Sequence, residues 1–343
     1  MPYQHKIILT TDDFGPQPAI NEGILELVRN AKVNSVNVLI NYFGNDTYKS
    51  SAENVKALVA AGKQAEEAHP GYELQIGCHF TITSGKPTCA EFDDALDDIK
   101  NVWVDEHGNF RDYVNMRRAV SEHRPAMNRL LKAELIEQHR LLKEALDQAA
   151  IGDYRKKVSY FNSHHNAVLM WKEYSNAFIE LAKEESMSVR SVVTYPKFRD
   201  SFYKQQISIR ALDDLSREDR VAYRKNQRLL PVKLLQSQVQ SPAFMDGRHY
   251  GPIPGFPVDH WPRVNNKQIK VGKAVNFLQS FNPPLTSELL LHVAHSSDDL
   301  WMKDIGYSGI NEKYTEGRKA EFDSLMRLRD GVLPEFGSWE QLR

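Results

Sequence analysis

Two adjacent carboxylates, Asp12 and Asp13, lie where an apolar run gives way to a loop. The run Ile7–Leu9 precedes them, and a helix-like segment begins near Pro18. Ligand sites in α/β folds gather at the edge where strands end, and there the chain can turn two neighbouring side chains inward. One carboxylate can then bind a metal while the other accepts a proton. The alternative is an aspartate that caps the following helix by accepting backbone N–H groups.

Histidines follow three later apolar runs that are typical of buried strands. His79 ends one run, His164 and His165 follow a second, and His292 follows a third. If these strands are parallel in one sheet, their carboxyl ends share a face, and the histidines converge with the aspartate pair. A single histidine at a strand end is more often a hydrogen-bonded structural residue. The repetition at three strand ends, with the aspartates at a fourth, favours a site.

An Asp/His/His set with open positions suits a divalent metal that must also hold water and substrate. Zn²⁺, Mn²⁺, Co²⁺ and Mg²⁺ all remain open, although imidazole favours the transition metals. Such an ion lowers the pKa of bound water and polarises a carbonyl. A second carboxylate can accept the water's proton, and a histidine can protonate the leaving group. The set therefore indicates metal-assisted hydrolysis of an amide or ester.

Short apolar runs alternate with longer amphipathic segments along the chain. Strands are expected at 7–9, 35–40, 74–81, 158–162, 188–193 and 289–293, and helices at 18–29, 52–69, 132–148 and 175–185. This alternation predicts an α/β fold with a parallel sheet or barrel and helices outside. Residues 91–125 and 198–267 break the alternation. We interpret them as irregular insertions, the second an ordered cap, in a single domain of residues 1–343.

Composition excludes several classes of protein. The chain has 343 residues, with 44 Lys and Arg against 45 Asp and Glu, which indicates neither a nucleic-acid surface nor a polybasic membrane patch. Its two cysteines, Cys78 and Cys89, make no disulfide framework and no four-cysteine zinc site. No apolar run approaches the roughly 20 residues of a membrane span, and we expect no signal peptide. A cytoplasmic protein without nucleic-acid or membrane partners is expected, and a homodimer stays open.

Ordered motifs carry a family resemblance. Residues 11–15 read Thr-Asp-Asp-Phe-Gly, and residues 21–24 read Asn-Glu-Gly-Ile. Residues 77–87 read Gly-Cys-His-Phe-Thr-Ile-Thr-Ser-Gly-Lys-Pro. Four shorter motifs follow: Ser163–His165, Val189–Arg190, Glu288–His292 and Arg318–Leu325. In this combination and order the chain resembles the YdjC-like carbohydrate deacetylases, the family of chitooligosaccharide deacetylase. The resemblance covers about residues 5–195 and 285–330.

The resemblance implies a distorted β/α barrel, a divalent metal (Zn, Mg, Mn or Co) and removal of acetyl groups from N-acetylated or O-acetylated mono- or oligosaccharides. By analogy with polysaccharide deacetylases, it implies that Asp13, His79 and His164 are the metal ligands. Asp12 is then the catalytic base, and His292 is the candidate acid. The partner implied is a small acetylated sugar.

Three further residues are candidates for substrate contacts: Arg190, His165 and Asn162. An arginine at a strand end, however, often only pairs with a nearby carboxylate. The histidine block also departs from the family's Asp-x-His-x-His-x-His, since the matching positions here are Asn162, His164, Asn166 and Val168, and the late His-Pro pair is His292-Val293. A neutral asparagine cannot orient an imidazole as strongly as an acid does.

Two other functions stay open. The scaffold could serve a metal hydrolase of another amide, ester or phosphoester, because fold analogy does not fix chemistry. A non-catalytic sugar-binding or regulatory protein is the second, and the neutral side chain of Asn162 agrees with it. The intact aspartate pair, with His79 and His164, counts against that loss of catalysis.

Overall fold

The computed structural model describes residues 6–41, 51–92, 95, 103–111, 124–164, 167–190, 216–241, 244–247, 287–296, 312–327 and 336–339. Seven strands form one sheet in the order β5-β4-β3-β2-β1-β7-β6. Their bounds are β1 Ile7–Phe14, β2 Ser35–Val38, β3 Gln75–Phe80, β4 Val158–Ser163, β5 Ser188–Val189, β6 Phe244–Gly247 and β7 Ser287–Leu291. Every neighbouring pair is parallel, so all carboxyl ends lie at one edge.

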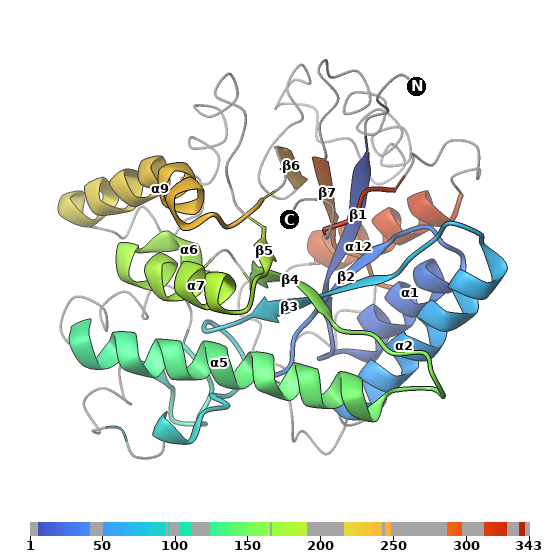
Figure 1. Ribbon diagram of the computed structural model, residues 1–343, viewed down its shortest axis with the longest axis horizontal. Coiled ribbons are helices and arrows are strands. Elements are labelled where there is room, and N and C mark those ends of the chain that lie inside the picture. Colours follow the sequence, from blue (N-terminus) through green and yellow to red (C-terminus); the bar gives the residue numbers. More distant parts are fainter. Residues whose placement is uncertain are drawn as a thin grey trace.

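The strand order is the sequence order read around a ring, which is the pattern of a β/α barrel. The two outer strands, β5 and β6, are consecutive among the described strands. Between them, the backbone N–H of Val189 donates to the carbonyl of Gln240, at 2.8 Å, just before β6. Figure 1 shows the curled sheet with helices around its outside. The expected distorted β/α barrel is confirmed.

Helices cover the outside of the sheet (Figure 1). They are α1 Pro18–Arg29, α2 Ser51–Ala68, α5 Arg124–Gln148, α6 Ala167–Met170, α7 Lys172–Glu184, α9 Arg217–Ser237 and α12 Glu312–Met326, with a 3₁₀ turn at Ala90–Phe92. Helix α1 begins with proline at its first position, where a missing N–H costs nothing, and buries Ile20, Ile24 and Leu27 at helical spacing. None of the helices in the described ranges has the length and apolar character that crossing a bilayer requires.

Aromatic packing fills the barrel at the end opposite the strands' carboxyl termini. The rings of Tyr160 and Trp339 stack with centroids 3.9 Å apart and planes 7° apart. The indole N–H of Trp339 donates to Ser35 Oγ at 3.1 Å, and Ser35 Oγ donates to the Tyr160 hydroxyl at 2.7 Å. All three residues are buried. This packing leaves the carboxyl edge as the place where polar side chains gather.

Two elements lie inside the segment 198–267, which the sequence indicates to be an irregular insertion. Helix α9 is a regular helix, and β6 pairs in parallel with β7 in the sheet. The sequence does not indicate β6 as a strand, because it is short and prolines and glycines surround it. Much of 198–267 and of the first expected insertion, 91–125, lies outside the described residues.

Candidate metal centre

The end of β1 turns both aspartates to the same side of the sheet. Its pairing register with β2 shifts between Thr11 and Phe14, and Asp13 has φ of 69°. A bulge and a left-handed backbone re-aim a side chain that would otherwise point away from its neighbour. The helix-capping alternative does not hold, because the residue that precedes the first turn of α1 is Gln17.

The turn after the aspartates is held from α1. The N–H of Gly15 donates to Asn21 Oδ1 at 2.8 Å, and Asn21 Nδ2 donates back to the Gly15 carbonyl at 3.2 Å. Gly15 has φ of +135°, and a Cβ there would lie 2.5 Å from the carbonyl oxygen of Leu39. Only glycine fits both demands. The Asp-Asp-Phe-Gly and Asn-x-Gly motifs therefore form one structural unit.

Asp13, His79 and His164 come together from the carboxyl ends of β1, β3 and β4 as the sequence predicts. Their candidate ligand atoms all lie within 4.8 Å of one another. Asp13 Oδ1 is 3.3 Å from His79 Nε2 and 3.1 Å from His164 Nδ1, and the two histidine nitrogens are 3.2 Å apart. All three side chains are at most 3% exposed.

These distances fit a shared divalent ion. Ligand atoms about 2.1 Å from one ion at tetrahedral angles lie about 3.4 Å apart. Asp13 Oδ1 is buried and, within the described residues, receives no hydrogen bond of good geometry. Burial, offset in part by Asp13, lowers the pKa of His164, which favours the neutral imidazole that a metal binds. The cluster is a candidate metal-binding triad.

Asp12 has a different set of partners. Arg190 Nη1 donates to its Oδ2 at 2.7 Å, and Asn37 Nδ2 donates to its Oδ1 at 2.6 Å. Asn162 Nδ2 lies 3.5 Å from the same Oδ1. Burial acts to raise the pKa of Asp12, but Arg190, His79 and His292 outweigh it and lower the pKa to about 2. Asp12 is therefore ionised at neutral pH.

Arg190 also binds Glu288, which lies on β7. Its Nε donates to both carboxylate oxygens of Glu288 at 2.9 Å, and its Nη2 makes a further bond to Oε1. Arg190 is 2% exposed and Glu288 is fully buried. The geometry therefore favours the carboxylate-pairing interpretation of Arg190. A buried arginine needs such partners, because an unpaired charge in this interior is costly.

Arg318 on α12 is a site residue whose role the sequence does not predict. Its Nη2 donates to Asp13 Oδ2, and the side chain is 1% exposed. Burial acts to raise the pKa of Asp13, but Arg318 and His164 outweigh it and hold the pKa well below its usual range. The signal was present in the Arg-x-x-Glu motif that begins at Arg318. An arginine on an amphipathic helix, however, is ordinarily a surface residue.

His292 also lies at the site. It is the first residue after β7, and its side chain is 12% exposed. Its Nε2 is 3.9 Å from Asp12 Oδ2 and 4.0 Å from Asp13 Oδ2. In the hydrogen bonds that the structure describes, the side chain of Asn162 contacts Asp12 and not a histidine. Its Oδ1 accepts the N–H of Ser163. His165 lies outside the described residues.

Gly77 explains part of the Gly-x-His motif. A Cβ at this position would lie 2.3 Å from Asn37 Oδ1 and 2.4 Å from the ring of Tyr160. Asn37 is the residue that donates to Asp12 at 2.6 Å. Glycine thus leaves room on β3 for a side chain of β2 that holds the end of β1.

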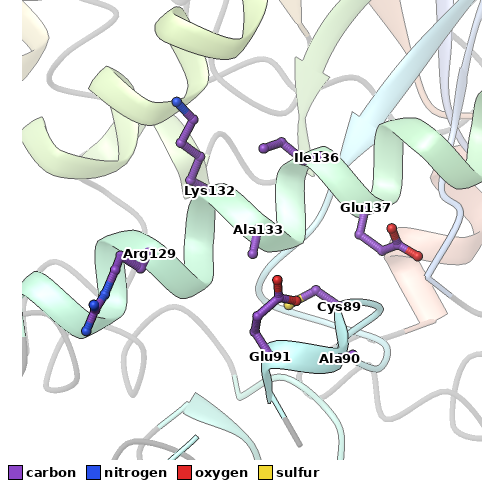
Figure 2. A pocket seen from close by; sticks show the side chains of 8 residues that line it. All are labelled: Cys89, Ala90, Glu91, Arg129, Lys132, Ala133, Ile136 and Glu137. Atoms are coloured by element: carbon purple, nitrogen blue, oxygen red, sulfur yellow. The ribbon is translucent and has the colours of Figure 1, made fainter. Parts of the chain in front are cut away.

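A separate cavity of about 430 Å³ lies beside α5 (Figure 2). It is lined by Cys89, Ala90, Glu91, Arg129, Lys132, Ala133, Ile136 and Glu137. None of the triad residues lines it. Burial raises the pKa of the Cys89 thiol, which is therefore unreactive near neutral pH, and Lys132 contacts Glu180 and Glu184 on α7. This cavity does not extend the site.

Fold and site together define an α/β-barrel protein with a candidate divalent-metal centre at the carboxyl edge of its sheet. The family model described as YdjC-like protein matches residues 6–329. The chain therefore belongs to the YdjC-like protein family, which confirms the resemblance found in the motifs.

Relatives named carbohydrate deacetylase come from several bacteria. The protein of Thermoanaerobacter pseudethanolicus is 26% identical over 185 residues, which are 54% of this chain and 59% of that one. The protein of Clostridium beijerinckii is 24% identical over 254 residues, 68% of this chain and 85% of that one. The match thus spans less than two thirds of the first relative and most of the second.

A solved structure shares the fold over its whole length. It is a protein of Enterococcus faecalis V583, provisionally described as a cellobiose-phosphate cleavage protein, with a TM-score of 0.58 and 18% identity. The alignment covers 99% of both chains. At this identity the likeness concerns the fold alone.

Proposed function

We propose that this protein is a metal-dependent hydrolase that removes acetyl groups from an N-acetylated or O-acetylated mono- or oligosaccharide. The observation that carries the proposal is the triad of Asp13, His79 and His164 with a second, separately held carboxylate, Asp12, beside it. Relatives named carbohydrate deacetylase support the substrate class. Asp13, His79 and His164 would hold the ion, whether Zn²⁺, Mn²⁺, Co²⁺ or Mg²⁺.

A bound divalent ion would supply polarisation of the scissile carbonyl and a lower pKa for water. Asp12 accepts the proton of the attacking water. Arg190 keeps Asp12 ionised and fixed, at some cost in basicity, since the arginine lowers the pKa of this carboxylate. Because Arg190 also binds Glu288, it lowers the pKa of Asp12 less than an arginine paired with Asp12 alone would.

His292 donates a proton to the leaving nitrogen or oxygen of the sugar. Its Nε2 is close to both aspartates, at 3.9 and 4.0 Å, and its side chain is the most exposed of the site residues that the structure describes. A partly exposed proton donor can reach the leaving group of a bound substrate. In this proposal Asp12 acts as base and His292 as acid at one reacting centre.

The test is acetate release from a panel of acetylated mono- and oligosaccharides, with each divalent metal added in turn to chelator-treated protein. We expect acetate from at least one sugar and restoration of activity by metal. His79→Ala should abolish both activity and metal binding. His139→Ala is the matched control, since His139 is also buried but packs on Phe161.

Three outcomes separate the alternatives. Acetate release that survives His79→Ala and Asp13→Ala would refute the assignment of the site. Phosphate release from phosphoesters without acetate would favour another metal hydrolase. Sugar binding without bound metal or any hydrolysis would favour the non-catalytic protein.

A further inference from the structure

Three helices each hold the backbone just beyond a strand end of the site. Asn21 of α1 binds both the N–H and the carbonyl of Gly15, two residues after Asp13. Gln138 of α5 does the same at Thr81, two residues after His79, accepting the N–H at 3.0 Å and donating to the carbonyl at 2.7 Å. Fixing the backbone in this way restricts the side chain that the strand presents.

The third case is the loop after β7, and here the helix residue is charged. Glu321 of α12 accepts the backbone N–H of His292 itself at its Oε2, at 2.9 Å. Glu321 is 1% exposed. A buried carboxylate that accepts a backbone N–H makes a stronger bond than an amide does, and it is costly to bury without such partners.

The same loop is held from the other side by α1. The N–H of His295 donates to the carbonyl of Ala19 at 2.8 Å. At Gly23 a Cβ would lie 2.9 Å from the His295 nitrogen and 3.2 Å from the carbonyl carbon of Ala294, so only glycine permits this approach. The contacts are to backbone, which cannot move aside as a flexible side chain does. The loop 292–295 is therefore clamped between α1 and α12.

We infer that Glu321 is a positioning residue for His292, with Gly23 supporting the same loop from α1. The inference rests on the proposed function, in which His292 is the acid. A positioning role predicts a selective defect, because the acid is needed only when the leaving group is poor. A sugar amide leaves as a basic amine and needs the proton, whereas an aryl acetate leaves as a stable phenolate and does not.

The experiment compares deacetylation of an N-acetylated sugar with hydrolysis of p-nitrophenyl acetate. In Glu321→Leu we expect amide turnover to fall about 100-fold, the loss typical of a displaced catalytic group, while ester turnover stays within about threefold. Glu321→Gln keeps an acceptor for the His292 N–H and should restore most of the amide activity. Asp323→Leu, on the same helix but paired with Lys319 near the surface, should leave both rates unchanged.

Metal affinity supplies the second readout. Co²⁺ titration should give Glu321→Leu an affinity within about threefold of wild type, because the bond described for Glu321 is to the backbone of His292, which is not a proposed metal ligand. Equal losses on amide and ester, or a tenfold loss of Co²⁺ affinity, would overturn the inference. If Glu321→Leu does not fold, Gly23→Ala displaces the same loop and must show the same split.

His292→Ala separates this inference from the proposed function. If wild type releases acetate and His292→Ala shows the amide-selective loss, but folded Glu321→Leu does not, only the positioning role is wrong. If His292→Ala shows no selective loss, His292 is not the acid and both assignments fall. If wild type releases no acetate from any sugar, the proposed function fails and the inference with it.

Discussion

Asp12 and Asp13 are neighbours in the chain but occupy two different environments. Both oxygens of Asp12 accept hydrogen bonds, from Asn37 and from Arg190. Among the described residues, Arg318 donates to Asp13 at Oδ2, while Asp13 Oδ1 faces two imidazole nitrogens at 3.1 and 3.3 Å. One carboxylate has a strong donor on each oxygen, while the other keeps an oxygen turned toward two imidazole nitrogens.

This difference suggests why the two aspartates have different proposed roles, one as a metal ligand and one as a base. An oxygen facing two imidazole nitrogens is suited to a metal, since a carboxylate oxygen and a neutral imidazole nitrogen are both metal ligands. A carboxylate fixed by charged and amide donors is suited to remain ionised in one orientation while it exchanges a proton. The bulge at Asp13 produces both environments from adjacent residues.

The largest expected effect follows from removing the charge of Asp12. Asp12→Asn should lower turnover by about 10²–10⁴, as for loss of a general base. Both the sugar amide and p-nitrophenyl acetate should slow, because the base acts on water in each reaction. Steady-state rates on the two substrates check this. An Asp12→Asn variant that hydrolyses the ester at the wild-type rate would contradict the role of Asp12.

Removing Arg190, the charged partner of Asp12, should lower the stability of the protein as well as its activity. Arg190→Met leaves Asp12 and Glu288 buried without their shared cation, so the free energy of unfolding should fall by about 3–5 kcal/mol. Arg140→Met is the control. Arg140 pairs with Glu137 and Glu144 on the surface, where such pairs contribute little to stability. Denaturant unfolding should give Arg190→Met a much lower free energy of unfolding than Arg140→Met. Equal losses of stability in the two variants would contradict the buried pairing of Arg190.

Glu288 provides a second test of this buried ion pairing. Burial raises the pKa of Glu288, although Arg190 opposes this. Once Arg190 is gone, Glu288→Gln removes one of the two unpaired charges. The double variant Arg190→Met with Glu288→Gln should therefore be more stable than Arg190→Met alone.

Acid should remove the stabilisation that comes from ionised Asp12. Its pKa is lowered from 3.8 to about 2, so its contribution is fully present above the unfolded value and is lost as pH falls through the folded value. The shift corresponds to about 2 kcal/mol. In chelator-treated protein, the unfolding free energy of wild type relative to Asp12→Asn should fall by about that amount between pH 5 and pH 2. A difference independent of pH over that range would contradict the low pKa.

The smallest effect is expected at Asn162. Its amide lies 3.5 Å from Asp12 Oδ1, too long for a strong bond, whereas Asn37 donates to the same oxygen at 2.6 Å. Asn162→Ala should lower deacetylation less than tenfold, and Asn37→Ala should lower it more. The reverse order in measured kcat would show that Asn162 has a role beyond this contact.

Much of the barrel could be predicted because its strands are buried on both faces and read as apolar runs. The convergence of His79, His164 and His292 follows from the parallel arrangement, which brings carboxyl ends to one edge. Strand β6 could not be predicted, because Phe244–Gly247 is too short to show a period.

The ion pairs of the charged residues around the site do not follow from local sequence. Arg318 follows Asp13 by 305 positions, and its Arg-x-x-Glu motif does not show that the side chain is buried against Asp13. Glu288 lies at the start of the apolar run of β7, where its buried partner Arg190 comes from another strand end. Local sequence shows which residues can do chemistry. Pairing between distant charges depends on how the barrel closes.

The most direct test of the division between the aspartates is divalent-ion titration of two matched variants, Asp12→Asn and Asp13→Asn, by calorimetry. We expect Asp12→Asn to bind one ion per chain with an affinity within about tenfold of wild type. We expect Asp13→Asn to lose at least about 100-fold in affinity, as for loss of a direct ligand. Equal losses in the two variants, or a larger loss in Asp12→Asn, would contradict the account.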